Sequence, residues 1–135
     1  MNFISGINAT SSALEAEKMR MDVVAENIAN AYTTRGLDGK AYQRKTIAFE
    51  ALLRSGSERS GGVRISEIGT DPNPGEIIHN PTHPHADKDG MVQMPNVSVS
   101  TEMVDLLAAS RAYEANLAVV RNARQMAAKA LSIGR

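Results

Sequence analysis

Residues 98–132, SVSTEMVDLLAASRAYEANLAVVRNARQMAAKALS, decide the fold. From Val99 to Leu131, steps of four and three residues pass through ten positions, and eight of these positions are apolar. A repeat of about 3.5 residues, held over several heptads, is typical of a helix that packs along another helix with a left-handed supercoil. The stretch therefore predicts one long helix, about 50 Å in length at the usual rise per residue.

The beginning of the chain carries a similar repeat. Stepping from Phe3 to Ile28 by four and three residues meets mostly apolar side chains, interrupted by Thr10 and Glu17. The pattern predicts a second long helix, which ends near the Thr-Thr-Arg-Gly run that follows Asn30.

The region between the helices lacks the seven-residue repeat and shows short stretches of alternating apolar residues instead. Alternation predicts strands in residues 42–53, 62–68 and 75–79, the first of which can run into a short helix at its AFEALL end. Residues 79–90 have no periodicity and predict an ordered loop at best. The expected fold is mainly α with a small β-containing middle: long N- and C-terminal helices form a coiled-coil-like layer, with short strands and loops between them. The predicted segments are 1–34, 35–95 and 96–135, in one structural unit.

Length and composition exclude several classes of protein. The chain has 135 residues, a net charge of zero and no cysteine. These values predict one domain, give no basic field for nucleic acid, and exclude disulfides, thiolate metal sites and a cysteine nucleophile. The N-terminus lacks a basic region followed by an apolar run, so no cleavable signal peptide is expected, and no apolar run is long enough for a transmembrane segment.

The two helices are too long for the middle region to cover. A partly irregular middle of about 60 residues cannot bury both apolar faces, so the helices must cover each other or be covered by other molecules. A helical hairpin that placed Glu17 opposite Arg124 would leave Phe3 with no residue opposite it, because the matching position falls past the last residue of the chain. The sequence therefore predicts assembly, or ends that stay unfolded until a partner binds.

One loop contains side chains that metals favour. His79, His83 and His85 are close to Asp87 and Asp89, and imidazoles with carboxylates can bind zinc. The spacing matches no known zinc motif, and the prolines between the histidines favour a rigid connection with His and Asp as turn residues. We predict no metal, no cofactor and no catalytic residue, hence no enzyme.

Three stretches resemble the flagellar basal-body rod proteins. Residues 5–36, SGINATSSALEAEKMRMDVVAENIANAYTTRG, resemble their N-terminal signature, and residues 102–134 resemble their C-terminal helix. The run HPHADKDGMVQMPNVSVSTEM, residues 83–103, resembles the proximal-rod members of that family. The chain departs from the family at Met91, where an aromatic residue is usual, and the resemblance is weakest over residues 50–78.

The resemblance implies a structural subunit of the proximal rod, which polymerises through its terminal helices into the torque-transmitting drive shaft of the flagellum. It implies export by the flagellar type III apparatus without signal cleavage, and a place in the rod that spans the periplasm. The implied partners are other rod subunits, further copies of itself, the export apparatus and the base of the basal body. Nucleic acid is not among them.

From the repeats and the resemblance together we predict an assembly interface. Its residues share seam positions or lie at the exit of the first helix: Phe3, Ile7, Leu14, Met21, Val24, Asn27, Ile28, Asn30, Met103, Leu106, Tyr113, Asn116, Leu117, Val120 and Leu131. A soluble helical adaptor or secretion chaperone that uses the same seams is the alternative from a different class. A metal-dependent enzyme at the histidine loop is a distant third.

Overall fold

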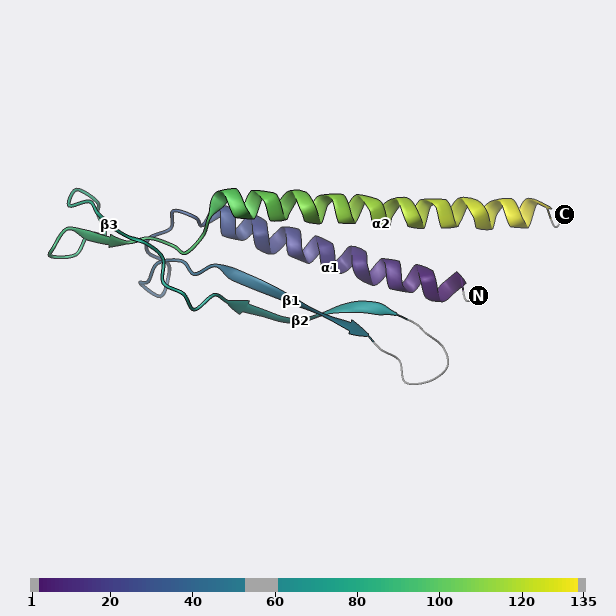
Figure 1. Ribbon diagram of the computed structural model, residues 1–135, viewed down its shortest axis with the longest axis horizontal. Coiled ribbons are helices and arrows are strands. Elements are labelled where there is room, and N and C mark those ends of the chain that lie inside the picture. The colour runs from purple at the N-terminus through teal and green to yellow at the C-terminus, as the bar shows by residue number, and fades with distance from the viewer. Residues whose placement is uncertain (1–2, 53–60, 134–135) are drawn as a thin grey trace.

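Two long helices dominate the structure, a computed structural model that describes residues 3–52 and 61–133, with the side chains of residues 3–5 left undescribed. Helix α1 spans Phe3–Ala29 and helix α2 spans Val99–Ile133. Four strands lie between them in sequence, in two small sheets. The expected architecture, mainly α with a small β-containing middle, is confirmed (Figure 1).

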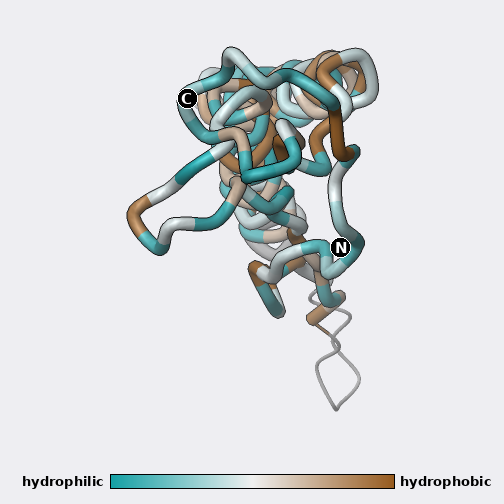
Figure 2. Tube along the Cα trace, turned by 90° about the vertical axis from the view of Figure 1, so that its left-hand side faces the viewer, coloured by the Kyte–Doolittle hydropathy of each residue, from teal (hydrophilic) through white to brown (hydrophobic). Residues whose placement is uncertain are grey.

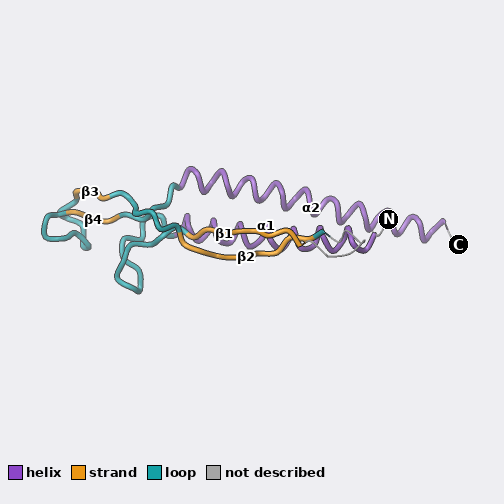
Figure 3. The backbone as a smooth tube through the Cα atoms, turned by 60° about the horizontal axis from the view of Figure 1, so that its bottom comes forward, coloured by secondary structure: helices purple, strands orange, loops and turns teal. Residues whose placement is uncertain are grey.

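Helix α1 is the central layer of the molecule. Helix α2 packs along one side of it in the antiparallel sense, and strands β1 (Lys45–Leu52) and β2 (Gly62–Thr70) pack along another (Figures 1 and 3). The Ser12 hydroxyl joins α1 to the hairpin, because it accepts a hydrogen bond from the Val63 backbone N–H at 3.0 Å. The layers explain why α1, although it is the shorter helix, has four buried residues among those described, whereas α2 has three.

The β1–β2 hairpin has one apolar face. Its antiparallel register pairs Ile47 with Ile68 and Phe49 with Ile65, and an irregularity between Ala48 and Phe49 shifts the pairing by one residue. Paired residues lie on the same face of a sheet, so the alternation in the sequence becomes an apolar surface. Strand β1 continues through Leu52, and the predicted short helix at the AFEALL end is wrong over the described residues. The expected apolar position at Leu53 lies outside them.

A second small sheet forms the end of the molecule opposite the chain termini (Figure 1). Strand β3 (Ile77–His79) pairs with β4 (Met91–Gln93), and the loop predicted over residues 79–90 joins them. Strand β4 was not predicted, because three residues carry no measurable alternation. Only glycine fits at position 75, because a Cβ on Gly75 would lie 2.0 Å from the Met94 carbonyl oxygen.

Small side chains fill the centre of the contact between the two helices. Ala109 is completely buried, Ala123 and Ala16 are nearly so, and Val23 and Val24 of α1 are buried as well. On α2 the buried positions are Glu102, Ala109 and Ala123. This inner seam therefore lies one residue away from the predicted repeat through Met103, Ser110 and Leu117. Figure 2, viewed from the β3–β4 end, shows hydrophobic and hydrophilic residues interspersed along the part of the trace that faces the viewer.

The register of the helices leaves α2 longer at one end. Asn27 lies beside Glu102, and Arg20 lies beside Asp105. Extending this register places the first residues of α1 beside about residue 124 of α2. The last turns of α2 therefore project beyond α1 (Figure 1), and Leu131 and Ile133 there are 77% and 84% exposed.

Candidate assembly surface

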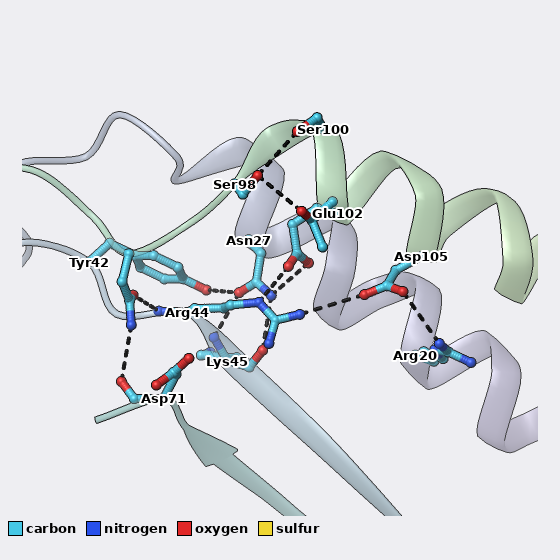
Figure 4. A network of polar contacts seen from close by, with 12 residues as sticks. Arg20, Asn27, Tyr42, Arg44, Lys45, Asp71, Ser98, Ser100, Glu102 and Asp105 are labelled. Carbon is cyan, nitrogen blue, oxygen red and sulfur yellow. Dashed lines mark hydrogen bonds and ion pairs between the residues drawn. The ribbon is translucent and has the colours of Figure 1, made fainter. Parts of the chain in front are cut away.

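A buried polar joint fixes the end where α1 stops and α2 begins (Figure 4). The Asn27 side chain is 1% exposed and makes four hydrogen bonds. Its Nδ2 donates to the Lys45 carbonyl at 2.9 Å and to Glu102 Oε2 at 3.0 Å. Its Oδ1 accepts from the Tyr42 hydroxyl at 2.9 Å and from the Lys45 N–H at 2.8 Å. One amide therefore connects α1, α2 and the start of β1.

Glu102 is the charged centre of this joint. Its carboxylate is completely buried and accepts a hydrogen bond from Arg44 Nε at 2.5 Å. Arg44 also lies 3.6 Å from Asp105, which in turn lies 3.7 Å from Arg20 on α1. A buried carboxylate is stable only when charge and hydrogen bonds compensate it, and here Arg44 and Asn27 supply both.

The chain that leads into α2 is tied to the same place. Asn96 Oδ1 accepts from the Arg44 N–H at 2.6 Å, and its Nδ2 donates to the carbonyl of Asn73 at 2.8 Å. The Asp71 N–H donates to the Arg44 carbonyl at 2.8 Å. The Asn96 side chain and the backbone of Arg44 thus fix where α2 begins relative to β1.

Tyr42 reports the electrostatics of the joint. Burial, together with the negative charges of Glu26 and Glu102, raises the pKa of Tyr42 to about 12. Ionisation would place a phenolate beside two carboxylates and remove the proton that Asn27 Oδ1 accepts. The hydroxyl therefore acts as a donor, in a neutral state.

The polar side chains at the exit of α1 make their contacts within the chain. Asn27 was predicted to contact neighbouring subunits, but its side chain is buried and fully used within the chain. Asn30 serves the helix end locally: its Nδ2 donates to the Glu26 carbonyl at 3.0 Å, and its Oδ1 accepts from Thr33 at 3.1 Å. Thr10, an interruption of the repeat, donates to the Gly6 carbonyl of its own helix at 2.8 Å.

Larger apolar side chains remain half covered beside the inner seam. On α1, Ile7, Leu14, Met21 and Ile28 recur every seven residues, and all four are half-buried. On α2, a stripe of the same spacing contains Met103, Leu117 and Leu131, of which Met103 is 57% exposed. Helical spacing places both stripes on the side of the pair that faces away from the hairpin. We call these seven residues the open flank.

Comparison with known proteins identifies the family. Residues 7–35 match the family described as flagella basal body rod protein, and residues 88–133 match the C-terminal family of flagellar basal body rod FlgEFG proteins. The flagellar basal-body rod protein FlgC of Yersinia enterocolitica is 39% identical over 99% of both chains. Its counterparts in Bacillus subtilis and Borreliella burgdorferi are 38% and 37% identical, over 100% and 98% of both chains. The chain belongs to the FlgC family.

Membership in the FlgC family makes the chain a structural subunit of the flagellar basal-body rod. Neither long helix, within the residues that the structure describes, is apolar enough over sufficient length to cross a membrane. The two matched segments contain most of α1 and the whole of α2, together with the β4 strand that precedes α2.

The remaining predicted interface residues lie in the inner seam or beside it. Val24 is buried, whereas Leu106, Tyr113, Asn116 and Val120 are half-buried on α2. Asn116 is two turns from both Ala109 and Ala123, so it belongs to the inner seam. The predicted contact at Phe3 falls on a side chain outside the described ones.

The histidine loop folds onto itself. His85 Nδ1 lies 2.8 Å from the Thr34 hydroxyl, and the His85 N–H donates to His83 Nδ1 at 3.1 Å. The rings of His83 and His85 meet edge to face, with centroids 5.4 Å apart. Among the residues described, no three His, Asp or Glu side chains converge as a metal site would require.

Sequence reasoning missed the main residues of the joint. Neither Glu102 nor Arg44 was among the predicted site residues. A signal for Glu102 was present, because it stands one heptad before Ala109 and three before Ala123. Arg44 could not have been found this way, since its partner lies 58 residues away in the sequence.

Proposed function

We propose that this rod subunit assembles through the open flank of its helix pair. The joint satisfies the polar groups at one end of the pair, while the flank leaves large apolar side chains half covered. Monomeric proteins seldom leave contiguous apolar surface of this kind without a partner. The flank residues on α1 and α2 differ, so contacts between them are heterologous and suit an open helical polymer.

The finer features of the proposal come from family resemblance. We place the subunit in the proximal rod across the periplasm, where it transmits torque to the rest of the flagellum. Its partners are further copies of itself, other rod subunits and the base of the basal body. It reaches them through the flagellar export apparatus without removal of a signal peptide, and it has no catalytic role.

The half-buried apolar stripe carries this proposal, and Leu117 is the residue to test. Leu117→Asp puts a charge among packed apolar groups, which costs several kcal/mol once a partner covers it. We expect the variant to be absent from purified basal bodies and the cells to be non-motile. Ala118→Asp is the matched control, because Ala118 is the exposed next residue and points away from the flank.

The two variants together separate assembly from folding. Circular dichroism of each purified chain should be the same as for the unmodified protein, since neither position belongs to the inner seam. Normal swimming with Leu117→Asp, at wild-type amounts in the basal body, would refute the role of the flank.

A further inference from the structure

Glu17 is a carboxylate that its own chain leaves incompletely satisfied. It lies three residues after Leu14 and four before Met21, so it borders the open flank on α1. Its side chain is 20% exposed, and its Oε2 atom is buried without accepting a hydrogen bond from the described residues. Leaving such an oxygen without a donor costs free energy. Oε2 itself is out of reach of another molecule, but a cation at the exposed part of the same side chain would offset the charge of the carboxylate.

The nearby Arg20 meets this need only weakly. Its guanidinium lies 3.9 Å from Glu17 Oε2, which is too long for a hydrogen bond. The same guanidinium also lies 3.7 Å from Asp105 on α2. One shared arginine therefore faces two carboxylates, and Glu17 retains room for a second cation on its exposed side.

Arg124 has the complementary property on the other helix. It is exposed, and within the part of the chain that the structure describes it forms no ion pair. It belongs to the seven-residue stripe of Leu117 and Leu131. The register of the helices places it near the first residues of α1, about 14 residues away from Glu17, so the two cannot meet within one copy.

We propose that Arg124 of one copy pairs with Glu17 of a second copy of this chain, across their open flanks. The pairing rests on the proposed function, since it needs copies that assemble in the same orientation. It requires the second copy to be shifted along the helix axis by about 14 residues, or roughly 21 Å. A charged pair within an apolar seam selects one register among several that apolar contacts alone would allow.

The distribution of charge on the two helices favours a second copy of this chain as the partner of Glu17. From residue 115 to the end of α2, the described residues include Arg121, Arg124 and Lys129 and no acid. Two such surfaces repel each other, whereas Glu17 attracts them. Because Glu17 and Arg124 lie on different helices, each copy offers one donor and one acceptor surface, and the contact repeats without closing.

Thiol crosslinking in assembled basal bodies tests the pair directly, because the chain has no cysteine of its own. Cells would produce Glu17→Cys and Arg124→Cys as two separate chains, and a short bismaleimide would be added to isolated basal bodies. We expect a crosslinked dimer of this chain. Glu17→Cys combined with Arg111→Cys is the matched control and should give none, since Arg111 is exposed on α2 outside the flank.

Three outcomes would overturn the inference. The first is no dimer, although both chains are present in the basal body. The second is a product that joins Glu17→Cys to a protein of different mass, which identifies another rod component as its partner. The third is an intramolecular link in the isolated double variant. Absence of the unmodified chain from basal bodies would instead refute the proposed function.

Charge reversal gives a second, independent measurement. In cells that carry either Glu17→Arg or Arg124→Glu, the fraction of motile cells should fall strongly. Each change places like charges together between copies. The chain that carries both changes restores opposite charges, so cells that produce it should regain motility. A double variant no better than the singles, with a helix content equal to that of the unmodified chain, would contradict the pairing.

Discussion

At the end where α1 stops and α2 begins, Asn27, Glu102 and Arg44 satisfy one another inside the chain. At the other end α2 continues past α1, and Leu131 is 77% exposed. The first end uses directional hydrogen bonds that only one register allows, whereas the second offers apolar contacts that tolerate several. The comparison suggests that a single chain fixes its helix register at the joint and leaves the rest of the surface to assembly.

Removing the charge at the joint should have the largest effect on stability. Glu102→Ala leaves Arg44 without its buried partner, so we expect the free energy of unfolding to fall by about 3 kcal/mol. Urea unfolding followed by circular dichroism measures it. Glu114→Ala, at an exposed position of the same helix, is the control and should change little. Equal losses in both variants would mean that the joint contributes nothing specific.

Asn27→Ala removes the amide that connects three segments. The carbonyl of Lys45 and the Glu102 carboxylate each lose a donor, and we expect a loss of about 2 kcal/mol. Asn122→Ala, at an exposed position of α2, matches its effect on helix propensity. Asn27→Ala and Glu102→Ala together should cost less than the sum of their separate effects, because they share a contact.

Tyr42 makes the joint sensitive to alkaline pH. The pKa of its hydroxyl rises from 10.0 to about 12 on folding, so the folded state resists ionisation more than the unfolded state does. Its contribution to stability is therefore complete below pH 10 and is lost as the pH rises from 10 to about 12. Tyr42→Phe should cost about 1 kcal/mol at neutral pH.

The same variant provides the control for the pH profile. Unfolding curves at several alkaline pH values should show a smaller decline for Tyr42→Phe than for the unmodified chain. Parallel profiles would show that other groups cause the whole decline.

A substitution in the projecting last turns of α2 should have the smallest effect on the stability of the isolated chain. Leu131→Ala should change the free energy of unfolding by less than about 0.5 kcal/mol, because the side chain is largely exposed. Val23→Ala in the inner seam, at 6% exposure, should cost about 1 kcal/mol or more. If Leu131→Ala were the more damaging change in thermal unfolding, the two ends would not differ as described.

The long helices could be predicted because periodicity is a local property. The spacing from Val99 to Leu131 and from Phe3 to Ile28 located α1 and α2 to within a residue or two of their observed ends. The inner seam could not be predicted so well. Large residues at Met103 and Leu117 give the stronger signal, but alanines allow closer helix approach and so occupy the centre.

The joint lay beyond prediction for a different reason. Asn27 looked like an ordinary polar residue at a helix end, and no local pattern indicated that Tyr42, Lys45 and Glu102 would surround it. Side chains far apart in the chain meet only when the whole topology is known. The interface of the open flank remains a prediction.

The contact between Asn27 and Glu102 also has a consequence for the order of folding. These residues are separated by 75 positions, and α2 is the last element of the chain. A chain delivered N-terminus first exposes α1 long before anything can cover it, and closing so long a loop costs entropy that only α2 repays. For the export proposed above, this contact can form only after α2 has followed the rest of the chain through the apparatus.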